Sequence, residues 1–429
     1  MNRGRVGLTV KPTTHDPASR CVDWAVVRAE FRLDPSLIHL THFLLASPPR
    51  QVREAADRWR AVLDRDPSLV EDLLLGSMSS LGTAGHGPYQ YAKNAMADYL
   101  GAAPDEVALM PSTTAALALV YHGLSLRAGQ ELLLTTDAHY SHLESARRAA
   151  EKRDSTVRTV RLARNAASAT VDEILASVQA AITSHTRVLG VTWVSSCTGL
   201  KLPLTAIAGI VAEANRDREP ADRCLLVVDG VHGFGVEDVD ATRLGADFFA
   251  AGAHKWFLGP AGTGILWGRP NAWTALSPTI PSFDFDTALH RRWLDGGALP
   301  PTKAAYLSPG GFADYANVFA LTEAAAFHRQ LSRPVIAARV HELNTRLRDG
   351  LADLPGLRLL TPRSPLLAGG IVCVQPKNHS VEYVVRTLRG LGITSAASPY
   401  QTPAVRLGAG VANTPEEIDR AVRALADIH

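Results

Sequence analysis

Two apolar runs of the sequence each end close to a residue that could do chemistry, an acid after the first run and an amine after the second. The run 224–228 ends at Asp229, and the run 246–251 is followed by His254 and Lys255. Short continuous apolar runs predict buried parallel strands, and open α/β sheets bind ligands beyond the carboxyl ends of their strands. A lysine facing a carboxylate there suits pyridoxal phosphate, whose aldehyde takes the lysine as a Schiff base while the acid holds the pyridinium proton.

A lone lysine in a loop is usually a solvated surface charge. Lys255 departs from that pattern because it lies between an apolar strand and Trp256-Phe257, and because several glycines follow it. Glycines allow a ligand and the backbone to approach closely. We therefore interpret Lys255 as a site residue on the strength of the whole segment rather than of the lysine alone.

Hydroxyl side chains follow the first predicted core strand. Ser112, Thr113 and Thr114 come after the apolar run 107–110 and open a helix predicted over 113–122. The free amides at a helix N-terminus, together with such hydroxyls, can hold a phosphate group. Ser and Thr are also ordinary N-caps, and taken alone the cluster is more typical of a capped helix.

Rings and imidazoles lie near the other predicted strand ends. His139 and Tyr140 follow the strand predicted over 131–135, where either side chain could stack on the pyridine ring. Surface aromatics on a loop are as common. His232 lies just beyond Asp229 and could reach the phenolate oxygen of the cofactor, and His254 could bind its phosphate.

Composition restricts the class of protein. The chain has 429 residues, 46% hydrophobic content and a formal net charge of +2, without a basic stripe interleaved with aromatics. We therefore expect a large buried core and no nucleic-acid partner. The first residues lack the apolar centre of a signal peptide, and no apolar run reaches membrane-spanning length, which predicts a cytoplasmic protein with no membrane partner. Four widely spaced cysteines without a CxxC motif predict neither a disulfide framework nor a metal site.

Strand and helix patterns alternate strictly through the middle of the chain. Between residues 107 and 228 the predicted strands are separated by helical patterns, including 141–152, 171–182 and 203–215. This alternation predicts an α/β fold with a mainly parallel, doubly wound sheet. After residue 300 the pattern changes, with long helices predicted over 316–330 and 334–351 and an apolar strand near 371–374. We predict an N-terminal arm (1–40), a large cofactor-binding domain (41–300) and a smaller α+β C-terminal domain (301–429).

The motifs together resemble one enzyme family. DGVHGFG follows the acid, AHKW contains the lysine and is followed by GPAGTG, and STTAA opens the first core helix. This combination is similar to the fold-type I pyridoxal phosphate enzymes of aminotransferase class V, in the branch of isopenicillin N epimerase and cysteine desulfurase. The resemblance extends from the segment IHLTHFLLASPP to VRLGAGVANTPEEID.

The resemblance implies a role for individual residues. Lys255 matches the Schiff-base lysine, Asp229 the partner of the pyridinium nitrogen and His232 the residue near the phenolate oxygen. Arg406, in the segment AVRLGAG, matches the arginine that binds the substrate carboxylate, a contact suited to a bidentate guanidinium. The positions that match phosphate ligands are Thr113, Thr114 and His254.

Two departures from the family pattern concern the site. Relatives usually have Ser or Thr where this chain has Gly252, so one phosphate hydroxyl is missing. Trp193 stands near a position often held by histidine, from which we expect a more apolar floor of the site.

The expected chemistry takes place at the α-carbon of an L-amino acid. Lys255, once released from the cofactor, acts as a general base, and the ring absorbs the resulting carbanion as a quinonoid. A cysteine desulfurase needs a nucleophilic cysteine before the late arginine, and the stretch ITSAASPYQTP has none, while Cys373 lies in an apolar run. Epimerisation needs a second acid on the opposite face, and the candidates are His139, Tyr140, His86 and Tyr89.

Several reactions share this first step. By family precedent the chain is an epimerase or C–X lyase of bacterial specialised metabolism. The alternatives are an oxygen-dependent oxidase that deaminates or decarboxylates an unusual amino acid, an aminotransferase, and a non-enzymatic cofactor-binding regulator or scaffold. The resemblance also implies a homodimer, since sites in this fold usually lie between two subunits.

Overall fold

A seven-stranded sheet forms the centre of the protein in the computed structural model, which describes residues 22–75, 87–282, 288–298 and 300–428. The strand order is β2-β8-β7-β6-β5-β3-β4. All neighbours pair in parallel except β8, which runs antiparallel to both β2 and β7. The strands are β2 (Val107–Met110), β3 (Glu131–Thr135), β4 (Thr156–Val160), β5 (Thr186–Thr192), β6 (Leu225–Asp229), β7 (Phe248–Gly252) and β8 (Gly264–Gly268). The prediction of a mainly parallel α/β sheet is confirmed, with β2 and β3 at the predicted residues.

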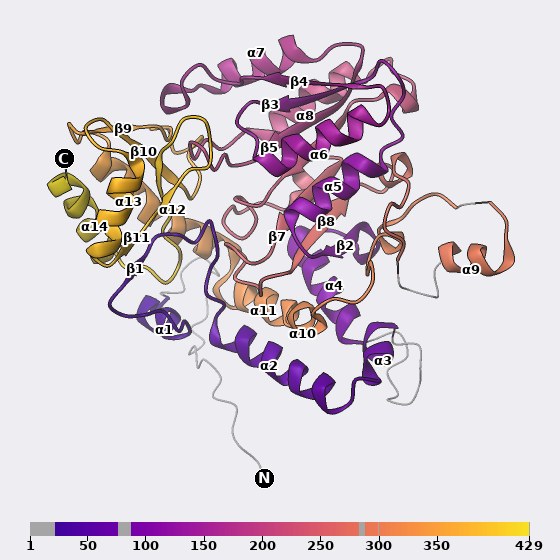
Figure 1. The fold of residues 1–429 in the computed structure, drawn as a ribbon, viewed down its shortest axis with the longest axis horizontal. Coiled ribbons are helices and arrows are strands. Elements are labelled where there is room, and N and C mark those ends of the chain that lie inside the picture. Colours follow the sequence, from indigo (N-terminus) through magenta and orange to yellow (C-terminus); the bar gives the residue numbers. More distant parts are fainter. Residues whose placement is uncertain (1–21, 76–86, 283–287, 299, 429) are drawn as a thin grey trace, which may run out of the picture.

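Apart from the edge strand β4, both faces of the large sheet are buried, which explains its continuous apolar strands. Successive side chains of a strand point to opposite faces, and accordingly Val227 belongs to one hydrophobic cluster and Val228 to the other. One face is covered by α5 (Thr113–Gly123) and α6 (Tyr140–Glu151). The other is covered by α4 (Pro88–Leu100), α7 (Val171–Ala181) and α8 (Leu204–Ala214). Figure 1 shows these helices on either side of the sheet.

A smaller antiparallel sheet lies beside the large one (Figure 1). Its order is β12-β13-β10-β9, from β9 (Leu357–Leu359), β10 (Val372–Pro376), β12 (Ala396–Ala397) and β13 (Val405–Leu407). The helices that pack with it are α12 (Arg333–Leu351), α13 (Val381–Gly390) and α14 (Pro415–Ile428). We call residues 333–428 the small unit.

Two contacts bear on how the chain divides. The short strand β1 (Ile38–His39) pairs in parallel with β11 (Ile393–Thr394), so this part of the predicted arm is attached to the small unit. In the other direction, α10 (Tyr315–Phe319) and α11 (Leu321–Leu331) pack on α4 and on α2 (Arg50–Arg65), against the large sheet. The predicted limits of the domains stay a prediction.

The single helix predicted over 316–330 is wrong. The chain forms two helices, α10 and α11, which meet at Ala320. The ψ angle of Ala320 is −8°, away from the ordinary helical value, and this turns the second helix relative to the first. Apolar periodicity continues through the break, so the sequence pattern does not reveal it.

In the described ranges, no helix is both long and apolar enough to cross a bilayer.

Candidate active site

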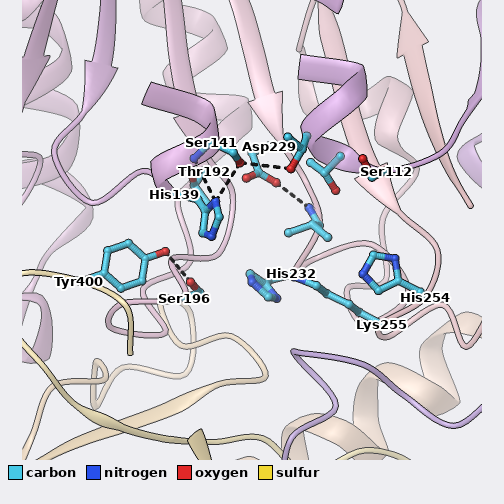
Figure 2. A pocket seen from close by; sticks show the side chains of 13 residues that line it. Ser112, His139, Ser141, Thr192, Ser196, Asp229, His232, His254, Lys255 and Tyr400 are labelled. Carbon is cyan, nitrogen blue, oxygen red and sulfur yellow. Dashed lines mark hydrogen bonds between the residues drawn. The ribbon is translucent and has the colours of Figure 1, made fainter. Parts of the chain in front are cut away.

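The carboxyl edge of the large sheet holds a pocket lined by thirteen side chains (Figure 2). They come from the loops after β2, β3, β5, β6 and β7, together with one loop of the small unit. The lining residues are Ser112, Thr113, Thr114, His139, Ser141, Thr192, Ser196, Asp229, Val231, His232, His254, Lys255 and Tyr400. Every residue predicted to bind the cofactor lies in this set, whereas Arg406 does not. The individual roles of these residues stay predictions.

Asp229 is the last residue of β6 and is 4% exposed. Its Oδ1 accepts a 3.1 Å hydrogen bond from the backbone amide of Val231. Burial raises the pKa of Asp229 to about 6, although the Val231 amide and the charge of Lys255 act in the opposite direction. No described residue donates a hydrogen bond to Oδ2. A buried carboxylate with a free oxygen at the pocket is suited to a protonated ring nitrogen.

The loop that carries Lys255 is anchored by the aromatic side chains that follow it. Trp256 and Phe257 are buried, and Phe257 stacks on Phe234 with ring centroids 4.6 Å apart. The backbone then turns at Leu258, whose φ of 60° lies in the left-handed region, and the Leu258 amide bonds back to the Lys255 carbonyl at 3.0 Å. Buried rings on one side of the loop leave the lysine to face the pocket.

The amine of Lys255 is partly buried and, within the described residues, forms no hydrogen bond or ion pair. Burial lowers its pKa to about 8, with Asp229 opposing the shift and Arg406 adding to it. The neutral amine is therefore accessible near neutral pH. A base with this pKa matches proton transfer at an activated carbon.

Some polar groups in the first turn of α5 already form hydrogen bonds within the protein, and the others are available to a ligand. Ser112 is the N-cap, and its hydroxyl accepts a 3.1 Å hydrogen bond from the Ala115 amide. The Oγ1 of Thr113 accepts a 2.7 Å hydrogen bond from the Gly252 amide. Thr114 is exposed and donates to the Ser141 hydroxyl at 3.2 Å. The capping role considered for this cluster is thus confirmed for Ser112, while the free amides and Thr114 still face the pocket.

His254 and Gly252 share one space beside this turn. A Cβ on Gly252 would lie 2.8 Å from Cε1 of His254, closer than real contacts allow. The Nδ1 atom of His254 is buried and has no hydrogen-bond partner in the described residues. Burial lowers the pKa of His254, and the charge of Lys255 lowers it further. A side chain at position 252 would therefore require the imidazole ring to move.

His139 faces the pocket as the N-cap of α6. Its Nδ1 accepts a 3.3 Å hydrogen bond from the Ser141 amide and lies 2.9 Å from the Ser141 hydroxyl, which fixes the ring. Tyr140, the other stacking candidate, is 72% exposed and does not line the pocket. His232 is 5% exposed, its Nδ1 has no described partner, and burial and Lys255 keep its pKa well below the ordinary value.

Arg406 lies in β13, behind the pocket lining rather than in it. Its guanidinium is 4.9 Å from the ring centre of Phe43 and donates to the Ala397 carbonyl at 3.0 Å. The residue is 5% exposed, and its Nε has no hydrogen-bond partner in the described residues. Burial lowers the pKa of Arg406. Its charge acts on His139, His232 and Lys255, so it contributes to the field of the site.

Other expectations about the site change with the structure. Trp193 does not line the pocket but packs under the turn at Gly233 and edge-on against Phe249, so the expected apolar floor is wrong. Thr192 lines the pocket at that place instead. Tyr89, a candidate second acid, is buried with its hydroxyl 2.6 Å from that of Ser308 and does not line the pocket. His86 lies outside the described residues.

No cysteine of the described residues lines the pocket. Cys373 is fully buried, as expected of a core thiol. Cys197 is partly buried, and burial raises its pKa to about 11, which keeps it a thiol. Within the described ranges, no group of three or more His, Cys, Asp or Glu side chains is placed to hold a metal ion.

Sequence reasoning did not find Ser141, Thr192, Ser196, Val231 or Tyr400. Ser141 and Thr192 follow predicted strands and could have been found by asking what else lies at the strand ends. Tyr400 had no such signal, because it comes from the small unit and reaches the pocket only through the packing of the two sheets.

The residues present fit pyridoxal phosphate. Asp229 has an oxygen that accepts no hydrogen bond from a described residue, Lys255 has an unpaired amine, and His232 and His254 each have a buried nitrogen without a described partner. Such orphaned groups are costly unless a ligand satisfies them. The amides of the α5 N-terminus can take the phosphate.

Similar proteins support this fit. The family model Aminotransferase class-V matches residues 74–421. The isopenicillin N epimerase of Streptomyces clavuligerus is 32% identical, over 94% of this chain and 98% of that protein. The isopenicillin N epimerase of Amycolatopsis lactamdurans is 28% identical, over 81% and 83%. A probable cysteine desulfurase of Xylella fastidiosa is 26% identical, over 95% of each.

Solved structures share the fold. The apo cysteine desulfurase of Thermococcus onnurineus NA1 has a TM-score of 0.78 at 20% identity, over 94% of this chain and 97% of that one. A variant of C-DES, with glycine covalently linked to the PLP cofactor, has a TM-score of 0.80 at 20% identity, over 93% and 99%. The family match and the epimerase at 32% identity establish that this chain belongs to the aminotransferase class V family of pyridoxal phosphate-dependent enzymes.

Proposed function

We propose that this enzyme moves a proton at the α-carbon of an L-amino acid and inverts that carbon, as an epimerase does. The observation that carries the proposal is the pairing of Lys255, whose pKa burial lowers to about 8, with a buried Asp229 at the ends of adjacent strands in one pocket. Two curated isopenicillin N epimerases among the relatives favour the same reaction.

The cofactor would be held at three places. Lys255 would hold it covalently through its aldehyde, Asp229 would bind its ring nitrogen, and the first turn of α5, with Thr114 and His254, would bind its phosphate. His139 would lie on the ring, and His232 beside the phenolate oxygen. When bound, pyridoxal phosphate supplies an electron sink for negative charge at the α-carbon.

Lys255 would then be the base. Its lowered pKa leaves enough neutral amine to accept the α-proton near neutral pH. Asp229 would keep the ring nitrogen protonated, because a carboxylate in a buried position gains most by pairing with a cation. Arg406 lies behind the lining, and it would attract the substrate carboxylate through its positive charge, which already acts on Lys255.

Sulfur transfer through a cysteine is not favoured. The described pocket has no thiol, and Cys197 holds its proton because burial raises its pKa to about 11. A thiol nucleophile instead needs a lowered pKa. Lysis of a C–X bond, transamination and oxygen-dependent oxidation share the α-proton step, and the experiment below separates them from epimerisation.

The homodimer, the cytoplasmic location and the role in bacterial specialised metabolism stay predictions. Gel filtration with light scattering tests the first of these directly. A mass near twice the 46.0 kDa of the chain is expected for the dimer.

The function is tested by incubating the pyridoxal phosphate-loaded enzyme with isopenicillin N and with each proteinogenic L-amino acid in D₂O, in air and under argon. Epimerisation appears as α-deuterium in both configurations with no oxygen uptake. Elimination products would identify the enzyme as a lyase instead. Keto acid formation without oxygen uptake would identify an aminotransferase, and oxygen uptake would identify an oxidase. If no panel member exchanges its α-proton, the proposal fails.

A further inference from the structure

One side chain of the small unit enters the pocket of the large sheet. Tyr400 lies in the loop between β12 and β13 and is the lining residue contributed by residues 333–428. Its ring stands edge-on to the ring of His139, with centroids 6.4 Å apart and an interplanar angle of 81°. This contact brings a phenol next to the imidazole that faces the cofactor position.

The hydroxyl of Tyr400 is held in place from both units. Its Oη lies 2.6 Å from Oγ of Ser196, which is 4% exposed and follows β5. The loop itself is closed, since the Ser398 amide donates to the Ala404 carbonyl at 2.8 Å and the Ala404 amide donates to Oγ of Ser398 at 2.9 Å. The position of the phenol is therefore set by hydrogen bonds rather than left to a mobile side chain.

Tyr400 and Lys255 lie on opposite sides of the pocket, with His232 between them and His139 above (Figure 2). A substrate carbon near the middle of the pocket thus has a proton-carrying group on each side. Of the other candidates for a second acid, Tyr140 is exposed and Tyr89 is buried against Ser308. His139 lines the pocket, but burial and the charges of Lys255 and Arg406 lower its pKa, so the imidazole carries no extra proton to donate near neutral pH.

The protonation states of the two groups are complementary. Burial raises the pKa of Tyr400 above its ordinary value, while the Ser196 hydrogen bond and the charge of Arg406 oppose the shift. The phenol keeps its proton at neutral pH, whereas Lys255 readily loses one. The nearby guanidinium of Arg406 would stabilise the phenolate that remains after proton donation.

We propose that Tyr400 donates the proton that the α-carbon receives on the face opposite Lys255, an inference that rests on the proposed epimerase function. Lys255 breaks the Cα–H bond and gains the proton as an ammonium. A new Cα–H bond forms on the other face while the Oη–H bond of Tyr400 breaks and leaves a phenolate. Water, through Ser196, returns a proton to Tyr400, and the ammonium releases one to water, so the turnover consumes none.

The first test does not need turnover. Apo protein labelled with [¹³Cζ]tyrosine is titrated by NMR, and the Tyr400 signal is the one that Tyr400→Phe removes. It should remain a phenol signal beyond the ordinary tyrosine pKa of about 10, and Ser196→Ala should displace it. A Tyr400 signal that titrates at the ordinary value and ignores Ser196→Ala would overturn the inference.

The second test separates the two faces. With the panel compound that the wild type inverts, Tyr400→Phe should reduce inversion about 100-fold or more, while deuterium still enters with retention on the Lys255 side. Tyr140→Phe is the matched control, since the same change is made next to His139 on an exposed residue, and it should leave both rates unchanged. Thermal melting checks that each variant is folded.

The outcomes distinguish the two proposals. Equal loss of inversion and retentive exchange in Tyr400→Phe, or unchanged inversion, overturns the role of Tyr400 and leaves the epimerase standing. A wild type that exchanges only with retention does not invert the carbon, so it removes both the epimerase and the donor role. A wild type that exchanges nothing sinks the proposed function and this inference with it.

Discussion

The ring of His254 occupies the space that a side chain at Gly252 would need, since a Cβ there would lie 2.8 Å from Cε1 and 3.0 Å from Nδ1 of the imidazole. The glycine and the histidine are therefore a matched pair at the phosphate end of the pocket. Any side chain at position 252 would have to displace this ring.

We predict that Gly252→Ser weakens cofactor binding about tenfold or more, because the new side chain displaces the ring of His254, and overpacking of this kind costs about 1–3 kcal/mol. The double variant Gly252→Ser/His254→Ala should recover much of the affinity, since the hydroxyl then has room beside Thr113. Fluorescence titration of apo protein with pyridoxal phosphate measures both. Additive losses in the double variant would contradict the pairing.

Lys255→Ala should lose the visible absorption of the covalently bound cofactor and nearly all α-proton exchange. The reason is that no other amine lines the pocket in the described residues. Lys201→Ala is the matched control, because Lys201 pairs with Glu237 at 2.9 Å away from the lining residues. Absorption and exchange that survive Lys255→Ala would refute the assignment of the lysine.

Asp229→Asn should change the pH dependence of apo-protein stability. The pKa of Asp229 is about 6 when folded and 3.8 ordinarily, so the folded state holds the proton more tightly. The stability that this gives is present below pH 3.8 and is lost as the pH rises through 6. At pH 7 the variant should exceed the wild type by up to about 3 kcal/mol, and near pH 4 the difference should be small.

Denaturant unfolding of both apo proteins at pH 4 and pH 7 measures this difference. A difference that does not depend on pH would show that Asp229 has no raised pKa. In the loaded enzyme, Asp229→Asn should still bind the cofactor but exchange α-protons about 100-fold more slowly, because a neutral amide cannot pair with a ring cation. Unchanged exchange would remove its electronic role.

Arg406→Ala should weaken binding of an amino acid about 100-fold or less, because the positive charge that attracts the carboxylate is removed. Binding of the corresponding methyl ester should change little, since the ester has no carboxylate. Spectral titration with alanine and alanine methyl ester tests this. Because Arg406 also packs on Phe43 and bonds to Ala397, Arg406→Lys serves as the control that keeps the charge. Equal effects on acid and ester would mean a structural role only.

Much of the fold could be predicted from local patterns. Continuous apolar strands that alternate with helices predict a sheet covered on both faces. Asp229 and Lys255 could be placed at one edge of that sheet, because the carboxyl ends of parallel strands lie at the same edge. The break at Ala320 could not be predicted, because the apolar period runs through it and only the packing of α10 and α11 on α2 and α4 reveals it.

The sequence by itself determined the chemistry-bearing groups of the large sheet, since their spacing along the chain follows the ends of its strands. Only the tertiary structure decided which of them face the pocket. It selected His139 over Tyr140, moved Trp193 under the turn at Gly233, and brought Tyr400 to Ser196. These contacts join segments far apart in the chain, and their geometry depends on how two sheets pack, for which no local pattern carries a signal.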